Sequence, residues 1–456
     1  MVAHSAVGAM RLLDELRAHD SWSRERLLAH QQRALREIVR HAAECSPYYR
    51  EALSAQARGG DVPLEELPTL SKATLMSQWD RIVTDPRLRL ADAERRLEGA
   101  GEPDLVPYRI FETGGSTGQR GIFVLGDAEF EAVLAGCLRA LATIGISSAT
   151  RLASIGSPSP VHLTNQVFAV FRATRAASPR LTVTMPREDL VTALNAYRPE
   201  AVMAYATIVR MLVEEQAAGR LRIEPRIVTS TSEVLGEETR RLVQQVWGVR
   251  AHNAYASTEG GMMATDCSEH CGLHLWEDTL IFEVVDERNQ PVPPGTPGHK
   301  VLLTNLWNRI QPLIRYELAD AVTLASGLNP TGRPFARIAE VEGRTADILR
   351  LPGVAGGMAA VHPIHLHMPF TRMPEVRQYQ FHPANDQLRV TLVLTPQAPP
   401  DIVERVRAAL GDALKAAGAA PLRILIEAVE SIPRVGSGAK LTLIASRPSA
   451  TNVEAR

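Results

Sequence analysis

The fold class is decided by one stretch of sequence, AVMAYATIVRMLVEEQAAGRLRIEPRIVTSTSEVLGEETRRLVQQVWG, residues 201–248. It begins with a short apolar run, Ala201–Ala206, which is followed by a helical pattern over Ile208–Ala218. A second run rich in β-branched residues, Arg226–Glu233, is followed by a second helical pattern over Glu237–Trp247. Strands that alternate with helices form parallel βαβ units, so the sequence predicts an α/β fold.

The rest of the chain extends this pattern and then departs from it. A helical pattern covers Ser23–Leu53, and Ser71 has the position of a cap at the start of another helix. From Leu280, two β-rich runs flank a Pro/Gly turn, which is typical of a hairpin. After Gly343, the runs LRVTLVL and LRILIEAV flank a helical pattern over Asp401–Ala416. We therefore expect a large α/β region followed by a small α+β unit of about 110 residues.

Composition indicates an ordinary soluble globular protein. The 456 residues exceed what one core usually accommodates, and 45% of them are hydrophobic and 22% charged. Fifty Lys and Arg against 51 Asp and Glu give a net charge of −1, which argues against nucleic acid and anionic membranes as partners. The sequence has no apolar run long enough for a spanning helix and no secretory pattern at its start. Four cysteines are too few for a disulfide framework, so a reducing cytoplasm is expected.

The first motif with chemical content is a glycine-rich loop, ETGGSTGQRG, at Glu112–Gly121. Its glycines let the backbone approach an anion closely, and its hydroxyl side chains add hydrogen-bond donors. The residues concerned are Thr113, Gly114, Gly115, Ser116, Thr117 and Gly118. The loop lacks the Gly-Lys-Ser/Thr ending of a Walker loop. It is a candidate cradle for the β- and γ-phosphates of ATP, although flexible surface turns have the same composition.

The second motif is NAYASTEGG, at Asn253–Gly261. With the glycine-rich loop and the segments described below, it resembles the adenylate-forming superfamily, and its phenylacetate–CoA ligase-like branch in particular. The resemblance extends over nearly the whole chain and depends on the joint order of the motifs. It implies that Tyr255 borders the adenine, that Thr258 bonds to the α-phosphate and that Glu259 ligates Mg²⁺. A carboxylate together with phosphate oxygens is a usual ligand set for this ion, whereas such a loop alone is more often an exposed turn.

Three further segments extend the resemblance around the nucleotide. TSTSEVLG corresponds to the family's adenine loop, which implies that Ser232, Glu233 and Val234 lie beside the base. PLIRYELAD ends in Asp320, at the position of the ribose-binding carboxylate. A carboxylate accepts hydrogen bonds from two hydroxyls well, since such charge-assisted bonds are strong. Arg344 corresponds to an arginine that contacts the ribose.

The C-terminal segments resemble a hinge followed by a mobile lid. The resemblance implies an N-terminal ATP- and acid-binding domain over residues 1–343, a hinge over residues 344–347 and a lid over residues 348–456. Lys440, in SIPRVGSGAKLTLI, corresponds to the catalytic lysine, whose ammonium group can stabilise charge between the attacking carboxylate and the α-phosphate. The chain departs from the family pattern at Ala346 in the hinge and at Ala439 directly before the lysine.

A Cys/His cluster lies shortly after the second motif, in DCSEHCGLH. Its candidate ligands are Cys267, His270, Cys271 and His274, which are residue types that bind zinc tetrahedrally. Four ligands within eight residues would strain one site, so three of them with a distant fourth ligand are the alternative. Thiolates and imidazoles favour a structural Zn²⁺. A metal-free loop that packs against the acid pocket is the other interpretation.

Candidates for the acid pocket come from the resemblance alone. Tyr205, His162, Trp276 and the pair Gly260 and Gly261 lie in segments that line the acid site in members of the family. A glycine pair would leave room for a flat ring, and a tyrosine or histidine could bond to a substituent.

The resemblance implies an AMP-forming ligase that activates a small carboxylic acid, aromatic in the branch resembled, as acyl-AMP and releases pyrophosphate. The expected cofactors are ATP and Mg²⁺, with structural Zn²⁺ as a further candidate, and the expected acceptor is the thiol of coenzyme A. Oligomeric state stays open, with a homodimer as one candidate. The two departures keep another chemistry open, a diazotase that joins nitrite to an aryl amine. A non-catalytic, zinc-stabilised binding protein on the same scaffold is the third interpretation.

Overall fold

The mixed α/β fold class predicted from the sequence is confirmed by the computed structural model. The structure describes residues 2–58, 63–97, 108–113, 121–175, 178–344, 349–354, 358–361, 366, 369–370, 373, 375–384 and 387–432. Contacts divide the chain into two compact units, the first mainly up to Val341 and the second mainly from Glu342. Among the described residues, no helix combines the length and apolar character that a membrane span requires.

The first unit is built on a large mixed sheet. Within the described residues this sheet has nine strands in the order β13-β14-β9-β8-β7-β6-β5-β3-β4. The strands are β3 (Leu152–Gly156), β4 (Leu181–Thr182), β5 (Ala201–Ala204), β6 (Ile227–Thr231), β7 (His252–Ser257), β8 (Gly261–Thr265), β9 (Leu273–Leu275), β13 (Asp320–Leu324) and β14 (Arg337–Arg344). Strands β4, β3, β5, β6 and β7 run parallel, whereas β8 turns back antiparallel to β7. The sheet is therefore parallel on one side and antiparallel on the other.

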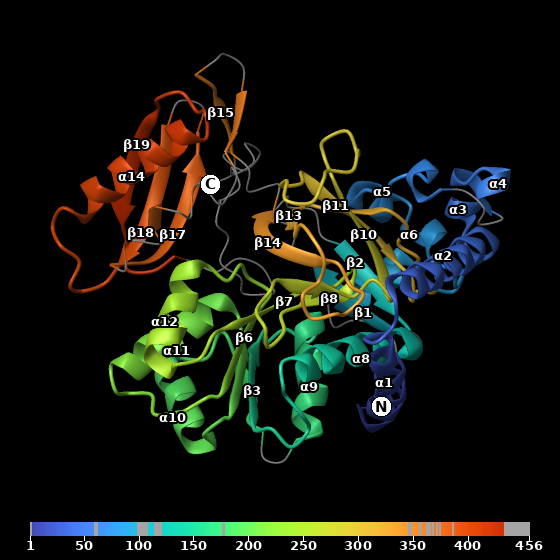
Figure 1. The fold of residues 1–456 in the computed structure, drawn as a ribbon, viewed down its shortest axis with the longest axis horizontal. Coiled ribbons are helices and arrows are strands. Elements are labelled where there is room, and N and C mark those ends of the chain that lie inside the picture. The colour runs from blue at the N-terminus through green and yellow to red at the C-terminus, as the bar shows by residue number, and fades with distance from the viewer. Residues whose placement is uncertain are drawn as a thin grey trace. The chain divides into compact units, whose positions relative to one another are not determined.

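Helices cover the parallel strands, as the alternating pattern predicts. They are α8 (Asp127–Thr143), α9 (Leu163–Ala173), α10 (Arg187–Tyr197), α11 (Ala206–Ala217) and α12 (Glu237–Trp247). Figure 1 shows α10, α11 and α12 on one side of these strands and α8 and α9 on the other. Helix α12 has the predicted bounds, and α11 begins two residues before the predicted start at Ile208. The predicted βαβ organisation of this region is confirmed.

The N-terminal helices lie before this sheet in the chain. They are α1 (Val2–His19), α2 (Arg24–Cys45), α3 (Pro47–Ala52), α4 (Ala55–Arg58), the short 3₁₀ helix η1 (Leu64–Glu66), α5 (Lys72–Ser77), α6 (Trp79–Ile82) and α7 (Leu90–Leu97). The single helix predicted over Ser23–Leu53 is wrong, because Ser46 adopts an extended conformation before Pro47. The cap predicted at Ser71 is confirmed, since its hydroxyl accepts a hydrogen bond from the amide of Thr74.

Two smaller antiparallel sheets complete the first unit. One joins β1 (Arg109–Thr113) to β2 (Gly121–Leu125), and the other joins β10 (Leu280–Val285), β11 (Lys300–Asn305) and β12 (Tyr316–Leu318). Strands β10 and β11 pair from Leu280 opposite Asn305 to Val285 opposite Lys300. The predicted hairpin is therefore confirmed.

The second unit has its own core. Its elements are β15 (Leu349–Pro352), β16 (Met358–Val361), β17 (Val376–Pro383), β18 (Gln387–Leu394), α14 (Ile402–Ala416) and β19 (Arg423–Ala428). Strand β18 pairs antiparallel with β17 and parallel with β19, which requires the intervening helix α14 as a crossover. Val390 and Leu392 of the sheet are fully buried with Val406 and Leu410 of the helix. The sequence predicted these two runs and the helix between them.

A buried polar network links the start of the first unit to its antiparallel strands. The guanidinium of Arg139, in α8, donates two hydrogen bonds to Asp278 at 2.8 and 3.0 Å and also contacts Asp20. His19 lies 2.8 Å from the same Asp278 carboxylate. The guanidinium also lies 4.1 Å from the centre of the Trp276 ring. Burial alone would raise the pKa of Asp278, but the hydrogen bond with His19 and the charge of Arg139 lower it overall.

We expect Arg139→Met to destabilise the first unit by about 3–5 kcal/mol, because it leaves the Asp278 carboxylate buried without its main counter-charge. Urea unfolding followed by tryptophan fluorescence measures this change. Arg226→Met is the matched control, since the Arg226 side chain is 74% exposed and its bond to Glu200 lies in solvent. An unchanged unfolding midpoint for Arg139→Met would show that the network does not stabilise the fold.

Candidate active site

The candidate site begins at the carboxyl edge of the parallel strands. Neighbouring strands β3, β5, β6 and β7 all run in the same direction. Their carboxyl ends therefore meet at one edge of the sheet, which is where open α/β sheets bind their ligands. The residues directly after these four strands are Ser157, Tyr205, Ser232 and Thr258. Three of the four were predicted as site residues from the sequence.

Tyr205 is the centre of a polar group at this edge. Its side chain is fully buried at the start of α11. Burial raises the pKa of its hydroxyl, and the charge of Glu233 adds to this rise. The nearby hydroxyls of Thr164 and Ser232 have the opposite effect and lower this pKa. Since Thr164 Oγ1 lies 2.5 Å from Nδ1 of His162, three predicted residues, His162, Ser232 and Glu233, gather near Tyr205.

The predicted adenine loop continues from this group. Ser232 adopts a left-handed backbone with φ of 68°, which turns the chain sharply after β6. The Glu233 carboxylate accepts a hydrogen bond of 2.9 Å from the amide of Thr207, at the start of α11. Val234 remains 40% exposed and offers an apolar surface directly beside these polar residues. Such a surface next to hydrogen-bonding groups suits a flat heterocycle.

Tyr255 and Asp320 meet although 65 residues separate them in sequence. The hydroxyl of Tyr255, in β7, donates a hydrogen bond of 2.6 Å to the carboxylate of Asp320, at the start of β13. The Tyr255 ring packs edge-on against Phe282 of β10, at 6.2 Å between ring centres. Both residues were predicted to border the nucleoside, one at the base and one at the ribose. Their contact gives the carboxylate a defined orientation.

The Thr258–Glu259 turn joins β7 to β8. Its backbone is held by the Ser257 hydroxyl, which accepts from the amide of Gly260 at 2.9 Å, and by the Asn305 side chain, which donates to the Glu259 carbonyl at 3.0 Å. Glu259 is mostly buried. Burial raises the pKa of Tyr316, and the negative charge of Glu259 raises it further. A carboxylate on a turn with a fixed backbone is suited to binding Mg²⁺.

The pair Gly260 and Gly261 was predicted to leave room for a flat ring of the substrate. The structure does not show such a space beside Gly260. A Cβ atom on Gly260 would lie 2.6 Å from Sδ of Met263, so that side of the turn is filled by the protein itself. Gly261 has a φ of +65°, and a Cβ there would approach Trp307 and Val133 at 3.4 Å. Close packing therefore favours glycine at position 260, whereas the left-handed backbone favours it at position 261.

Trp276 also differs from its prediction as a pocket residue. Its ring is 1% exposed and packs edge-on against Phe335, with Arg139 above it. Trp276 belongs to the buried network of the first unit.

The glycine-rich loop is described only at its first residue. Thr113 ends β1, and its hydroxyl accepts a hydrogen bond of 3.1 Å from Nζ of Lys72. Gly114, Gly115, Ser116, Thr117 and Gly118 lie outside the described residues. Sequence reasoning missed Lys72, which brings a positive charge beside the start of a loop predicted to bind phosphate. No local pattern could reveal it, because 41 residues separate Lys72 from Thr113.

Most of the residues predicted for the hinge and the catalytic lysine loop lie outside the described part of the structure. Arg344 ends β14, but its side chain lies outside the described part of the structure. Ala346 and Lys440 also lie outside it. Their roles stay predictions from the resemblance.

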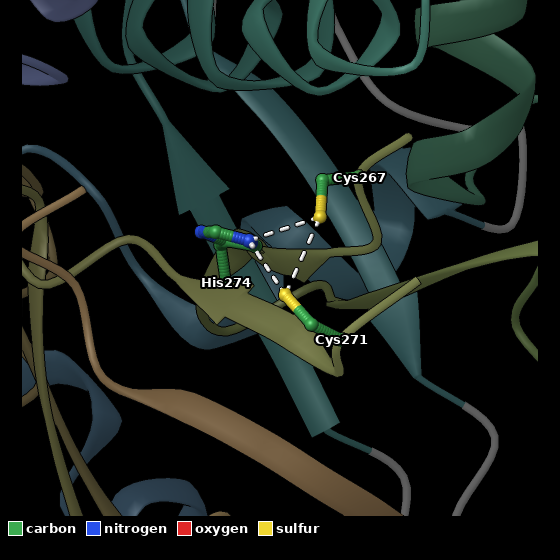
Figure 2. Close-up of side chains that lie close together, drawn as sticks. All are labelled: Cys267, Cys271 and His274. Atoms are coloured by element: carbon green, nitrogen blue, oxygen red, sulfur yellow. Dashed lines mark hydrogen bonds between the residues drawn. The ribbon is translucent and has the colours of Figure 1, made fainter. Parts of the chain in front are cut away.

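The Cys/His loop between β8 and β9 brings three of its four predicted ligands together. Figure 2 shows Cys267, Cys271 and His274 pointing toward one another. The two sulfur atoms lie 3.7 Å apart, and Nε2 of His274 lies 3.1 Å from Cys267 Sγ and 3.7 Å from Cys271 Sγ. Cys267 and His274 are buried and Cys271 is partly exposed.

The fourth predicted ligand, His270, points elsewhere. Its Nδ1 lies 3.0 Å from the Asp266 carboxylate, and its ring stacks on His252 at 4.4 Å. Burial lowers the pKa of His252 to about 4, and the neighbouring His270 contributes. His270 has a φ of 49°, which turns its side chain away from the cysteines. The region therefore has two separate groups, one of sulfur and nitrogen ligands on the loop and β9, and one of nitrogen and oxygen ligands that includes His252 of β7.

Burial also controls the protonation of the three-residue group. It raises the pKa of the Cys267 thiol to about 12, and the adjacent Glu269 carboxylate adds to the rise. Burial lowers the pKa of His274 to about 4, with a contribution from the positive charges of Arg333 and Arg337. His274 is therefore a neutral imidazole near pH 7.

Comparisons with known proteins agree with the motif order. A family model described as AMP-binding enzyme matches residues 95–302. The chain is 30% identical over 198 residues to a phenylacetate–coenzyme A ligase of Thermus thermophilus, covering 41% of this chain and 43% of that protein. It is 24% identical over 349 residues to the corresponding ligase of Aromatoleum evansii, covering 73% of each. The match to the Thermus enzyme thus spans less than half of that enzyme's length.

Solved structures with the same fold include two acyl–CoA ligases. A 2-hydroxyisobutyryl-CoA ligase in the postadenylation state aligns with a TM-score of 0.73 at 18% identity, over 93% of this chain and 90% of that one. An anthranilate–CoA ligase in complex with anthranoyl-AMP aligns with a TM-score of 0.55 at 16% identity, over 73% of this chain and 64% of that one. At these identities the likeness establishes the fold. The family match, the similar ligases and the order of the motifs together support a place for this chain in the adenylate-forming superfamily.

Proposed function

We propose that the protein is an AMP-forming ligase that activates a carboxylic acid with ATP and transfers the acyl group to coenzyme A. One observation supports this proposal most: Tyr205, Ser232 and Thr258 directly follow the adjacent parallel strands β5, β6 and β7, so their loops emerge at one edge of the sheet. The Thermus and Aromatoleum relatives are named phenylacetate–coenzyme A ligases, which supports coenzyme A as the acceptor.

The nucleoside is proposed to lie between the adenine loop and Asp320. Val234 provides an apolar surface for the base, and the Asp320 carboxylate accepts hydrogen bonds from the ribose hydroxyls. The hydrogen bond from Tyr255 orients this carboxylate before ATP binds, which lowers the entropy lost on binding. The side chain of Arg344 is proposed to contact the same ribose.

The phosphates are proposed to occupy the glycine-rich loop, with Thr258 on the α-phosphate. Backbone amides over residues 114–118 would donate to the phosphate oxygens, and Lys72 adds a positive charge near Thr113. Glu259 would hold Mg²⁺, which supplies positive charge to the phosphates when bound. The Thr258–Glu259 turn can hold these groups in a fixed position because Ser257 and Asn305 fix its backbone.

The reaction then has two displacements. In the first, an oxygen of the acid's carboxylate bonds to the α-phosphorus while the bond to the β-phosphate breaks, and pyrophosphate leaves. In the second, the thiolate of coenzyme A bonds to the acyl carbon while the carbon–oxygen bond to AMP breaks, and AMP leaves. The ammonium group of Lys440 stabilises the negative charge that develops in the first step.

A small aromatic acid is the proposed substrate class. The relatives named for phenylacetate and the structural neighbour bound to anthranoyl-AMP support this class. The polar group around Tyr205 and His162 could hydrogen-bond to a substituent of the ring.

A diazotase is the second candidate function. Ala346 in the hinge and Ala439 before Lys440 differ from the family pattern, and these differences favour a reaction without coenzyme A. A panel of acids, tested for pyrophosphate release with coenzyme A and separately with nitrite plus an aryl amine, distinguishes the two. We expect release that depends on an aromatic acid, followed by thioester formation. Release only with nitrite and the amine would select the diazotase. No turnover under any condition would select the non-catalytic binding protein.

We expect Asp320→Ala to raise the KM for ATP about 10–100-fold, because hydrogen bonds to a charged group contribute about 1.5–3 kcal/mol. The KM for the acid should change little. Tyr255→Phe keeps the carboxylate and removes only its orienting hydrogen bond, so its effect on the KM for ATP should be smaller. Initial rates of pyrophosphate release measure both variants. An unchanged KM for ATP in Asp320→Ala would exclude the ribose role.

Lys440→Ala should lower the rate of adenylation by about 10²–10³-fold, as expected when one stabilising charge is removed from a transition state. ATP binding, measured by calorimetry, should be nearly unchanged. Lys415→Ala is the control, since Lys415 is an exposed lysine of the second unit. Equal adenylation rates in the wild type and Lys440→Ala would remove Lys440 from the mechanism.

A further inference from the structure

We propose that Cys267, Cys271 and His274 bind one structural zinc ion that fixes the loop between β8 and β9 to the start of β9. This site lies outside the proposed catalytic machinery and does not depend on it. The three ligand atoms converge from both ends of one short loop, as Figure 2 shows.

The distances between the ligand atoms agree with a zinc tetrahedron. With Zn–S bonds of about 2.3 Å and Zn–N bonds of about 2.0 Å, tetrahedral geometry places two sulfurs about 3.8 Å apart and a sulfur and a nitrogen about 3.5 Å apart. The observed separations are 3.7 Å for the sulfurs and 3.1 and 3.7 Å for the sulfur–nitrogen pairs. A disulfide would require about 2.0 Å between the sulfurs. The group is therefore arranged for a shared ion.

The ligand types select the metal. Two thiolates and one imidazole are soft to intermediate ligands, which favour zinc over the oxygen-seeking Mg²⁺ or Ca²⁺. The neighbouring group of His252, Asp266 and His270 has no sulfur, so it lacks the thiolates that favour zinc most strongly.

The surrounding residues hold the ligands in place. The amide of Asn329 lies 3.2 Å from Nδ1 of His274, so the ring presents its other nitrogen to the sulfurs. Arg337 of β14 donates a hydrogen bond to the carbonyl of Cys271. Gly272 has a φ of +106°, and a Cβ there would lie 2.7 Å from the carbonyl oxygen of Ile338. The turn between the second cysteine and the histidine can therefore approach β14 only because it is glycine.

The position of the site makes the ion structural. Strand β8 leads from Gly261, next to the Thr258–Glu259 turn, to Thr265, two residues before Cys267. A strand advances about 3.3 Å per residue, so its two ends are about 13 Å apart. An ion at the far end cannot reach the reacting phosphate. It instead fixes a loop of seven residues, 266–272, between two strands of the main sheet.

Metal content of the full-length protein tests the proposal. We expect about one zinc per chain, by inductively coupled plasma mass spectrometry, after tag-free purification and dialysis against metal-free buffer. Cys271→Ser and His274→Ala should reduce this content to below about one tenth. His270→Asn is the matched control, because it changes a neighbouring residue that points to Asp266 and asparagine tolerates a positive φ. Cys45→Ser, at an exposed cysteine, is a second control, and both should keep the ion.

A second measurement uses only the wild type, in case the ligand variants fail to fold. Replacement of zinc by cobalt should give the sulfur-to-metal charge-transfer absorption of a thiolate site. Removal of zinc by a chelator should lower the Tm by about 5 °C or more, as expected when a bound ion stabilises the folded state. Wild-type protein without zinc after refolding in its presence would overturn the proposal, as would a native disulfide between Cys267 and Cys271. Equal zinc in wild type and folded Cys271→Ser would also overturn it.

Discussion

The parallel pairing of β3, β5, β6 and β7 is the constraint on which the rest of the first unit depends. Because these strands share one direction, the loops that follow them must emerge at one edge. Residues spread over about a hundred positions of sequence, from Ser157 to Glu259, thereby become neighbours. The parallel pairing of β5 and β6 is what brings Tyr205 near Glu233. Without it, the segments predicted to bind the nucleotide would be separate loops.

Much of the fold could be predicted because its elements carry local patterns. Helix α12 and the β10–β11 hairpin follow directly from apolar periodicity and turn residues. The parallel βαβ units also explain why Tyr205 and Ser232 lie at one edge of the sheet, a proximity that was not predicted from the sequence. The break at Ser46 was missed because apolar residues continue on both sides of Pro47, and only the missing amide and restricted backbone of proline interrupt the helix.

Features that depend on distant contacts could not be predicted. The hydrogen bond between Lys72 and Thr113 and the contacts of Arg139 with Asp278 join residues 41 and 139 positions apart, and no periodicity describes such pairs. The glycine pair looked like space for a ligand, whereas Met263 occupies the space beside Gly260. His270 has the right chemistry for a metal and the right spacing, but its left-handed backbone directs it to Asp266. Residue type and spacing do not specify side-chain direction.

The central position of strand β8 affects how the first unit unfolds. Its five residues are buried, and its backbone pairs with β7 on one side and β9 on the other. Amide protons of such a central strand exchange with solvent only when a large part of the sheet unfolds cooperatively. The Thr258–Glu259 turn and the cysteine loop, one at each end of β8, should therefore gain and lose order within a single cooperative unit. Slow hydrogen exchange across both ends of the strand would be the signature of that shared unfolding.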